Sequence, residues 1–402
     1  MIKIVLITVG QPSVNPRIVK EADALAGKGY EVTLLYSYVI KWASEKDVNI
    51  FEDVKWKYKE VGGSPTSNKL LFIFTKARVQ FFYLLQKLFG IKLFNTAERT
   101  QARAYDELLH AAKNIKADWY IGHNLGALAI VVNAAKYNNA KAGFDFEDYH
   151  RGEGHDKITL KRIIFLENKY IPSLNYYSTS SHFITQNVKL NHPQFKRQVI
   201  TLLNCFPLLQ QPVFVEKVTT NHTLHLFWFS QTIGINRGLE ILIMALKLLK
   251  NNNIQLTLAG NCSIDFLSYI KNNAGEIFCN IHFAGIIEPA NLPAFASNFD
   301  VGMAIELSKP YNRDICLTNK IFTYLLAGNA IILSQTAMQN TFNNKFNVGQ
   351  SFAENNAIEL AEKINFYLSL DKLNEQKKHN YELAKSKLNW ENESKKLLAI
   401  IN

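Results

Sequence analysis

Cysteine is scarce in this chain of 402 residues, and the four cysteines that occur lie far apart. They form no CxxC or CxxH spacing, so neither a zinc site nor a disulfide framework is expected. We therefore expect no bound metal and a reducing, cytoplasmic environment. The chain also opens directly on a strand-like segment, Ile2–Val9, and no signal peptide is expected before it.

Long apolar runs are missing as well, since no uncharged stretch reaches the roughly 18–20 residues that a membrane-spanning helix needs. Acidic residues are absent between Glu60 and Glu98, and part of the chain's net charge of +11 arises there. This interval holds basic residues at Lys69, Lys76, Arg78, Lys87 and Lys92 and aromatic rings at Phe72, Phe74, Phe81, Phe82, Tyr83, Phe89 and Phe94.

Two interpretations fit this basic, aromatic segment, residues 68–94. A helix of such composition can lie in the interface of an anionic membrane, held by its cations and buried rings. It can equally pack on the first domain as one of a helix pair, with its lysines extending to water. Nucleic acid fits less well, because the rings come in apolar blocks and not as an open stacking platform. The membrane interpretation predicts a peripheral protein at the inner face of the cell membrane.

Strand-like and helical patterns alternate along the chain, whose 48% hydrophobic and 20% charged residues are typical of globular proteins. The first half predicts strands at Ile2–Val9, Tyr30–Tyr36, Asp118–Gly122, Lys141–Phe146, Tyr176–Ser180 and Val199–Leu203. The second half predicts strands at Leu224–Phe229, Ile254–Ala259, Ile281–Ala284, Val301–Ile305 and Ala330–Ser334. Helical patterns separate them, among them residues 289–297, and only helices are predicted after Ser351.

Apolar strands that alternate with helices indicate parallel sheets covered on both faces. The predicted fold class is therefore α/β, with two Rossmann-like, doubly wound domains that face a cleft. We place the first domain at residues 1–207, with the last helix, 390–402, packing back on it, and the second at residues 208–389. Ligands of such folds bind at the carboxyl ends of the strands.

Two glycine-rich phosphate motifs are absent. The loop after the first strand has Gly10 but no GxGxxG, which argues against a nicotinamide-dependent enzyme. The second domain has no GxxxxGK[ST] motif, so it is not a P-loop domain. Gly10 would let a substrate approach the backbone closely, although an ordinary turn glycine would look the same.

The most informative segment runs from Asn312 to Ser334. Thr318 precedes a short helix and can cap its first N–H groups, while Gly328 can end that helix in the left-handed conformation. Lys320 stands in the first turn, where the helix dipole disfavours a cation by roughly 0.3–1 kcal/mol. With Arg313 nearby, this arrangement suits a bound anion such as a nucleotide diphosphate. A surface charge without function is the alternative.

A second junction of the same kind follows the strand at Leu224–Phe229. Arg237 and Gly238 stand at a helix start, where the glycine permits close approach of a ligand and the guanidinium can bind phosphate oxygens. Alone this signal is weak. Paired with Arg313 and Lys320 in the same domain it becomes stronger.

Polar side chains also follow several predicted strands. His123 and Asn124 end one strand, Asp145 and Glu147 end the next, and Glu306 ends Val301–Ile305. Histidines and carboxylates at strand ends can bind sugar hydroxyls or transfer protons. Loop capping and a solvated glutamate are the alternatives.

These segments together resemble GT-B fold glycosyltransferases, and among them the retaining enzymes of glycosyltransferase family 4. The resemblance covers nearly the whole chain and depends on the order and spacing of modest motifs. Those motifs are Asn15-Pro16-Arg17 through Glu31-Val32 ("PR…KEA..L…G.EV"), Asp118–Asn124, Phe144–Asp148, Asn204–Pro207, Arg237-Gly238-Leu239-Glu240 ("RGLE"), Asn319–Gly328 ("NK.FEY.A.G") and the terminal helix from Trp390.

The resemblance implies transfer of a sugar from a UDP- or GDP-linked donor to a saccharide or lipid-linked acceptor, with retention and without a catalytic metal or other cofactor. The second domain would hold the donor. In catalysis it implies roles for His123, Arg237, Lys320 and Glu306. Donor binding would involve Gly10, Gly238, Asn312, Arg313, Asn319 and Thr323, and sugar or acceptor contacts would come from Asn124, Asp145 and Glu147.

One departure from the family pattern bears on activity. Many members carry two glutamates eight positions apart, and this chain has Ile315 and Thr323 in that register. Glu306 or Asp314 could replace the sugar contact, and Thr323 could offer a weaker hydrogen bond to ribose. We expect a glycosyltransferase of bacterial surface polysaccharide or glycolipid synthesis. The alternative is a catalytically inactive GT-B scaffold or carbohydrate-binding partner of another transferase.

Overall fold

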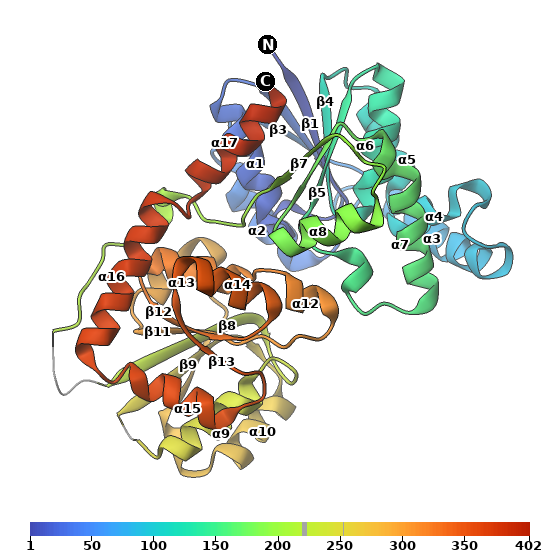
Figure 1. Cartoon of the computed structure of the whole chain (residues 1–402). Helices are drawn as coiled ribbons and strands as arrows, with labels where there is room; N and C mark the ends of the chain where they lie inside the picture. The colour runs from blue at the N-terminus through green and yellow to red at the C-terminus, as the bar shows by residue number, and fades with distance from the viewer. Residues whose placement is uncertain (219–222, 252) are drawn as a thin grey trace. The chain divides into compact units, whose positions relative to one another are not determined.

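The computed structural model describes residues 1–218, 223–251 and 253–402 of the chain (Figure 1). The chain divides into two compact units. The first contains Met1–Leu202 together with Ser394–Asn402, and the second contains Leu203–Glu393. The last helix, α17 (Trp390–Ile401), therefore begins in the second unit and ends in the first.

The first unit is built on a seven-stranded parallel sheet in the order β3-β2-β1-β4-β5-β6-β7. Its strands are β1 (Lys3–Thr8), β2 (Glu31–Tyr36), β3 (Lys57–Glu60), β4 (Trp119–His123), β5 (Lys141–Phe146), β6 (Tyr176–Thr179) and β7 (Gln198–Thr201). Its helices are α1 (Pro16–Gly27), α2 (Lys41–Phe51), α3 (Lys69–Phe89), α4 (Thr96–Gln101), α5 (Tyr105–Lys113), α6 (Leu125–Asn138), α7 (Lys157–Tyr170) and α8 (His182–Asn191).

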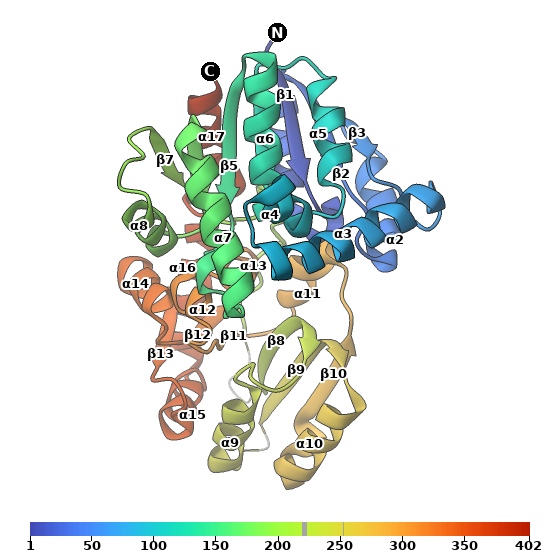
Figure 2. The same cartoon turned by 90° about the vertical axis from the view of Figure 1, so that its right-hand side faces the viewer.

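Helices cover both faces of this sheet. In Figures 1 and 2, α5, α6 and α7 lie over one face, while α1 and the end of α17 lie over the other. On the second face, Ile18 and Leu25 of α1 pack with Leu397 of α17 and with the inner side chains of β1, β2 and β4. Asn15 begins α1 by accepting a hydrogen bond from the N–H of Ile18, with Pro16 in the first turn, where proline loses no helical bond.

The second unit is built on a six-stranded parallel sheet in the order β10-β9-β8-β11-β12-β13. Its strands are β8 (Leu224–Ile233), β9 (Ile254–Cys262), β10 (Ile281–Gly285), β11 (Val301–Ala304), β12 (Ala330–Ser334) and β13 (Gly349–Phe352). Its helices are α9 (Leu239–Leu249), α10 (Ile264–Ala274), α11 (Leu292–Ala296), α12 (Tyr311–Ile315), α13 (Asn319–Ala327), α14 (Ala337–Phe346), α15 (Ala357–Phe366) and α16 (Leu370–Ser386).

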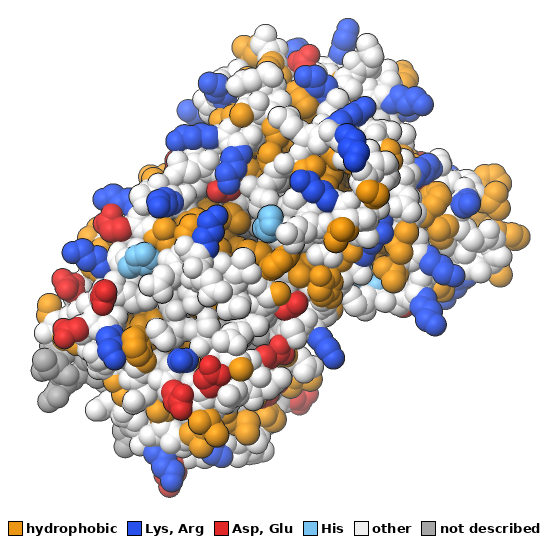
Figure 3. Space-filling model, viewed as in Figure 1, with side chains coloured by type: hydrophobic (Ala, Val, Ile, Leu, Met, Phe, Trp, Pro, Cys, Tyr) orange, Lys and Arg blue, Asp and Glu red, His pale blue; other side chains and the backbone are white. Residues whose placement is uncertain are grey.

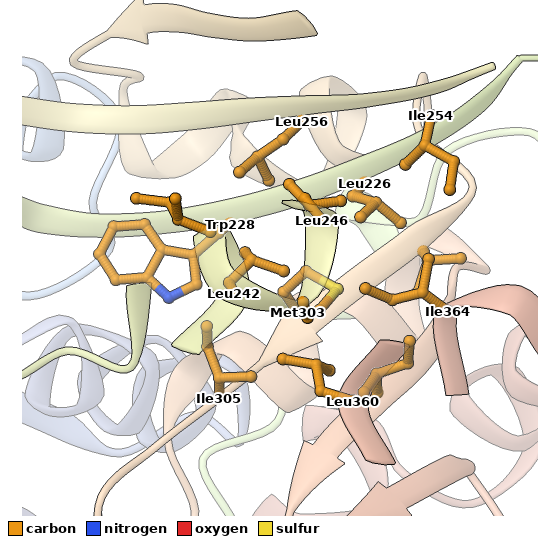
Figure 4. Close-up of a cluster of buried hydrophobic side chains, with 14 of the residues drawn as sticks. Leu226, Trp228, Leu242, Leu246, Ile254, Leu256, Met303, Ile305, Leu360 and Ile364 are labelled. Carbon is orange, nitrogen blue, oxygen red and sulfur yellow. The ribbon is translucent and has the colours of Figure 1, made fainter. Parts of the chain in front are cut away.

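An apolar core joins α9 and α15 to one face of the second sheet. Figure 4 shows Leu242 and Leu246 of α9 and Leu360 and Ile364 of α15 beside Leu226, Trp228, Leu256 and Met303 of the strands. On the opposite face, Tyr324 of α13 donates a hydrogen bond to the carbonyl of Phe227 at 3.0 Å. Gly302 makes room for this tyrosine, since a Cβ at Gly302 would lie 2.2 Å from the Tyr324 ring.

The predicted fold class of two doubly wound parallel-sheet domains is confirmed, and so is each predicted strand, within a few residues at its ends. Two strands escaped prediction, β3 and β13, and both lie at sheet edges. Their sequences, KYKE and GQSF, lack the apolar run of a strand buried on both faces. The helix predicted over residues 289–297 is a 3₁₀ turn followed by the short α11.

Candidate functional site

The predicted helix start at Thr318 exists, but one detail of the prediction was wrong. Thr318 is the N-terminal flanking residue of α13, yet its hydroxyl makes no capping hydrogen bond. The oxygens Thr318 Oγ1 and Thr323 Oγ1 are both buried and have no hydrogen-bond partner within the described residues. An unpaired buried polar group costs about 1–3 kcal/mol, so the start of α13 favours a ligand or water that would complete these bonds. Gly328 ends α13 at φ 73°, as predicted.

Lys320 and Glu306, predicted separately, form an ion pair. The Nζ of Lys320 lies 2.6 Å from Oε1 of Glu306, and the two residues are 8% and 7% exposed. The Nζ also lies 5.3 Å from the centroid of the Trp228 ring, within range of a cation–π contact. Glu306 is held in turn by its own N–H, which donates to Ser334 Oγ at 2.8 Å. The ammonium of Lys320 is therefore held at the first turn of α13, where the carboxylate of Glu306 offsets part of its positive charge.

Arg237 and Gly238 form the second helix start, as predicted. Gly238 precedes α9 at φ 78°, and a Cβ there would lie 3.4 Å from Ile305, next to Glu306. Gly238, Ile305, Glu306 and Ser334 line one small pocket of the second unit. The partly exposed guanidinium of Arg237 makes no hydrogen bond or ion pair with any residue that the structure describes.

Three further residues predicted for the donor, Asn312, Arg313 and Asn319, lie on α12 and at the start of α13. Arg313 Nη1 donates to the carbonyl of Asn236 at 3.1 Å, which ties α12 to the loop that carries Arg237. Asn312 is largely buried. Asn319 is exposed, and its Oδ1 accepts a hydrogen bond from Asn204 Nδ2 at 2.7 Å. The loop that carries Arg237 and Gly238 is thus linked to Arg313 of α12, and Glu306 is linked to Lys320 of α13.

Four ionisable side chains are buried together in the first unit. Arg17 of α1 binds Asp145 of β5 with two hydrogen bonds, Nε to Oδ2 at 2.7 Å and Nη2 to Oδ1 at 2.9 Å. His123 at the end of β4 places Nε2 3.1 Å from Glu21 Oε2 and Nδ1 3.7 Å from Asp145 Oδ2. All four are at most 1% exposed. We call these residues the buried quartet.

Charge pairing shifts the pKa values of the buried quartet. Burial would raise the pKa of Asp145, but Arg17 and His123 outweigh it and hold that pKa below its usual range. Burial would likewise lower the pKa of His123, but the carboxylates of Glu21 and Asp145 outweigh it and raise that pKa. Both shifts favour the charged forms, as expected of opposite charges in a low-dielectric interior.

Such a cluster could in principle bind a metal ion. Glu21, His123 and Asp145 each offer one ligand atom, and these three atoms lie within 4.8 Å of one another. Arg17 argues against it. The guanidinium already uses both oxygens of Asp145 and would repel a cation placed beside it. Ser178 Oγ adds a further hydrogen bond to Asp145 at 2.5 Å. The donor set is that of an ion-pair network.

The other predicted residues of the first unit surround this quartet. Asn124 adopts φ 65°, and its Oδ1 accepts from Thr8 Oγ1 at 2.7 Å. That hydroxyl oxygen accepts from the N–H of Gly10 at 3.3 Å, so Asn124 and Gly10 are linked. Glu147 follows β5 and is partly exposed; burial, reinforced by Asp148, raises its pKa to about 7.

Arg17, Glu21 and Ser178 were not predicted as site residues. Arg17 and Glu21 stand in the "PR…KEA" segment, which served only to support the family resemblance. The sequence did contain a signal for Arg17 and Glu21, since a basic and an acidic residue interrupt the apolar side of α1. Charged residues are rarely buried unless they are paired, so their positions predict buried partners.

The structure resembles solved glycosyltransferases over its whole length. Anabaena HepE in complex with UDP and glucose is 13% identical and matches with a TM-score of 0.67, covering 99% of each chain. A glycosyltransferase from Rickettsia africae is 13% identical, with a TM-score of 0.64 and coverage of 100% and 98%. A mutant of S. aureus TarM, in complex with Fondaparinux, alpha-GlcNAc-glycerol and UDP, is 12% identical, with a TM-score of 0.68 and full coverage of both chains.

At these identities the likeness concerns the fold, which is the GT-B fold expected from the sequence motifs. No protein-family model matches the sequence, and no curated protein matches it either. Within the described residues, no helix is both long and apolar enough to cross a bilayer.

Proposed function

We propose that this protein is a glycosyltransferase that moves a sugar from a nucleotide-diphosphate donor to a saccharide or lipid-linked acceptor. The observation that carries the proposal is the cluster at the starts of α9 and α13. The cluster contains the ammonium of Lys320, and it contains the guanidinium of Arg237 and the hydroxyls of Thr318 and Thr323, which have no partner among the residues that the structure describes. Anions bind at helix starts of this kind.

The donor diphosphate would bind to the free N–H groups of α9 and α13. Arg237 would bind its oxygens directly, because no protein carboxylate competes for that guanidinium within the described residues. Lys320 would act as a cation whose position Glu306 fixes at 2.6 Å. Preorganised positive charge of this kind stabilises the diphosphate as it departs with the negative charge, and such stabilisation is usually the largest single contribution to catalysis.

We further propose UDP as the nucleotide, in preference to GDP, and transfer of a hexose or related sugar with retention and without a metal, as in family 4. UDP is bound in the HepE and TarM structures that this fold resembles. Thr323 stands in place of the family's second glutamate and is 0% exposed, so this structure does not present its hydroxyl to a ribose. Glu306, which is paired with Lys320 at 2.6 Å, would contact the sugar.

Surface polysaccharide or glycolipid synthesis at the membrane surface is the setting that we propose. The α3 surface consists of exposed apolar side chains on α3 and the following 3₁₀ turn: Leu70, Ile73, Phe74, Phe81, Leu84, Leu88, Phe89, Leu93 and Phe94. Leu70, Leu88 and Phe94 are 83%, 74% and 71% exposed. Figure 3 shows apolar side chains gathered at this part of the first unit, with basic side chains beside them.

The helix-packing interpretation of residues 68–94 accounts for one side of α3, and the membrane interpretation is our proposal for the other side. α3 packs through a narrow stripe that includes Thr75, Phe82 and Gln86, while its other apolar side chains face solvent. Arg78 is paired with Glu107, but Lys69, Lys76, Lys87 and Lys92 are exposed and have no acidic neighbour in sequence. A large exposed apolar surface bordered by lysines suits an anionic lipid interface, where each lysine contributes about 1 kcal/mol.

A thermal-shift screen of UDP, GDP, ADP and their common sugar conjugates tests the donor site. A ligand present at 100 times its Kd stabilises the native state by about 2.7 kcal/mol. We expect UDP and a UDP-sugar to raise the melting temperature and ADP to leave it unchanged. No shift with any nucleotide, in protein shown to be folded, would instead favour the inactive scaffold.

A further inference from the structure

The charges of the buried quartet balance only if His123 carries one of them. Glu21 and Asp145 are carboxylates at most 1% exposed, and Arg17 is a single permanent cation at 0%. The guanidinium of Arg17 donates two hydrogen bonds to Asp145 and one to the carbonyl of Leu202, at 2.9 Å. Glu21 therefore faces only His123 as a partner in the quartet, and an unpaired buried carboxylate costs several kcal/mol.

The positions of the two ring nitrogens of His123 agree with this charge balance. Nε2 is within hydrogen-bond distance of Glu21 Oε2, at 3.1 Å, whereas Nδ1 lies 3.7 Å from Asp145 Oδ2, which is an ion-pair distance beyond hydrogen-bond range. A neutral imidazole has one nitrogen with a lone pair and no proton. In one tautomer that lone pair would point at Glu21, and in the other at Asp145. Only the imidazolium presents an N–H to both carboxylates.

We propose that His123 is a permanent imidazolium, held between Glu21 and Asp145, and that it acts as a positioning residue and not as a proton acceptor. The groups around it agree. From α1, Arg17 and Glu21 face it, and Asp145 faces it from β5. Glu147 and Tyr176 lie nearby on the loop after β5 and on β6, and Tyr176 Oη has no hydrogen-bond partner within the described residues.

This assignment gives the quartet a structural task at the carboxyl edge of the sheet. His123 is the last residue of β4, and Asn124 follows it with a positive φ of 65°. Through Thr8, Asn124 is linked to the N–H of Gly10, so a fixed His123 also fixes the loop after β1. His123 is 1% exposed and its Nε2 is already bonded to Glu21, so the ring offers no accessible N–H to a substrate.

The test is a histidine nitrogen NMR spectrum of the full chain labelled with ¹⁵N in its imidazole rings. At about pH 8, well above the usual histidine pKa of about 6.5, we expect both nitrogens of His123 at the positions of an imidazolium. His123→Gln assigns the signals, and exposed His110 serves as the internal reference. A neutral His123 ring, in either tautomer, would overturn the proposal. This includes the case in which the proton resides on Glu21.

Glu21→Gln supplies the matched comparison, because it removes one negative charge and keeps the shape of the side chain. We expect His123 to become neutral at about pH 8 in this variant, with Arg17 and Asp145 still paired. An imidazolium that persists in Glu21→Gln would overturn the role assigned to Glu21. If the variant does not fold, the wild-type spectrum still decides. Neither spectrum requires a nucleotide or a sugar, so the result stands independently of the proposed transferase activity.

Discussion

Lys320 and Glu306 lie 14 positions apart in the sequence and only 2.6 Å apart in the structure. Lys320 is the first-turn lysine of α13, and Glu306 follows β11. Tyr324 helps to hold α13 in place against the sheet, because its hydroxyl donates a hydrogen bond to the carbonyl of Phe227 on β8. The pair places a cation where a helix dipole alone would disfavour it.

Breaking this pair will destabilise the fold. Lys320→Met leaves Glu306 buried without its cation, and removal of one partner of a buried pair costs about 3–5 kcal/mol. We expect Lys320→Met combined with Glu306→Gln to recover most of that loss, because no unpaired charge remains. Urea unfolding of the single and double variants measures both quantities. Equal stability of Lys320→Met and wild type would mean that the pair contributes nothing.

Arg237→Ala will weaken nucleotide binding without weakening the fold. Within the described residues the guanidinium has no protein partner to lose, so we expect a change in unfolding free energy below about 0.5 kcal/mol. Loss of a charge-assisted contact of about 1.5–3 kcal/mol predicts a fall of well over tenfold in UDP affinity and turnover. Calorimetry with UDP measures the affinity.

The control for Arg237→Ala is Lys247→Ala, which removes an exposed cation from the last turn of the same helix, α9. We expect this variant to bind UDP as the wild type does. A similar loss in both variants would indicate a general effect of net charge, and unchanged affinity in both would remove Arg237 from the donor site.

Truncating the α3 surface will abolish binding to anionic vesicles. We expect wild type to co-sediment with vesicles that contain phosphatidylglycerol and to remain in solution with phosphatidylcholine alone, because both lysines and rings contribute. Phe89→Ser combined with Phe94→Ser removes two rings that are 63% and 71% exposed and should release most of the protein.

Ile264→Ser is the matched control for the vesicle experiment. Ile264 is 81% exposed and begins α10 in the second unit. We expect its substitution to leave vesicle binding intact. If the wild-type protein binds neither anionic nor neutral vesicles, the membrane proposal is wrong and α3 only packs on its own domain.

Glu147 will make stability depend on pH. Its pKa is raised to about 7 by burial and by Asp148, and the ordinary value is 4.5. Between these values the native state holds the proton that the unfolded state has lost, so this residue lowers stability as pH rises from 4.5 through about 7. We expect Glu147→Gln to be more stable than wild type at pH 8, by roughly 1–3 kcal/mol, and to differ little at pH 4.5.

Chemical unfolding at several pH values measures this difference. Asp156→Asn is a suitable control for the removal of a carboxylate, since Asp156 caps α7 by accepting the N–H groups of Ile158 and Thr159 at the surface. Asparagine caps a helix start about as well as aspartate, so we expect Asp156→Asn to change stability only slightly at neutral pH. A gap between wild type and Glu147→Gln that stays constant with pH would contradict the assignment.

The sequence by itself determined the interior of both sheets. Strands such as Val301–Ala304 and Ala330–Ser334 are apolar on both faces, and this pattern depends only on the order of residues along the chain. The sequence also predicted the two helix starts with their cations, Arg237 and Lys320. Helix capping and the helix dipole act between residues that are close in sequence, so both can be inferred without the fold.

Only the tertiary structure decided which charges meet. The edge strands β3 and β13 have no apolar signature, and pairing with a neighbouring strand alone defines them. Arg17 and Asp145 are 128 positions apart, and Glu21 and His123 are 102 apart. The sequence shows ionisable residues on predicted helices and strands, but the free energy of a buried charge depends on the partner about 3 Å away, and folding sets that partner.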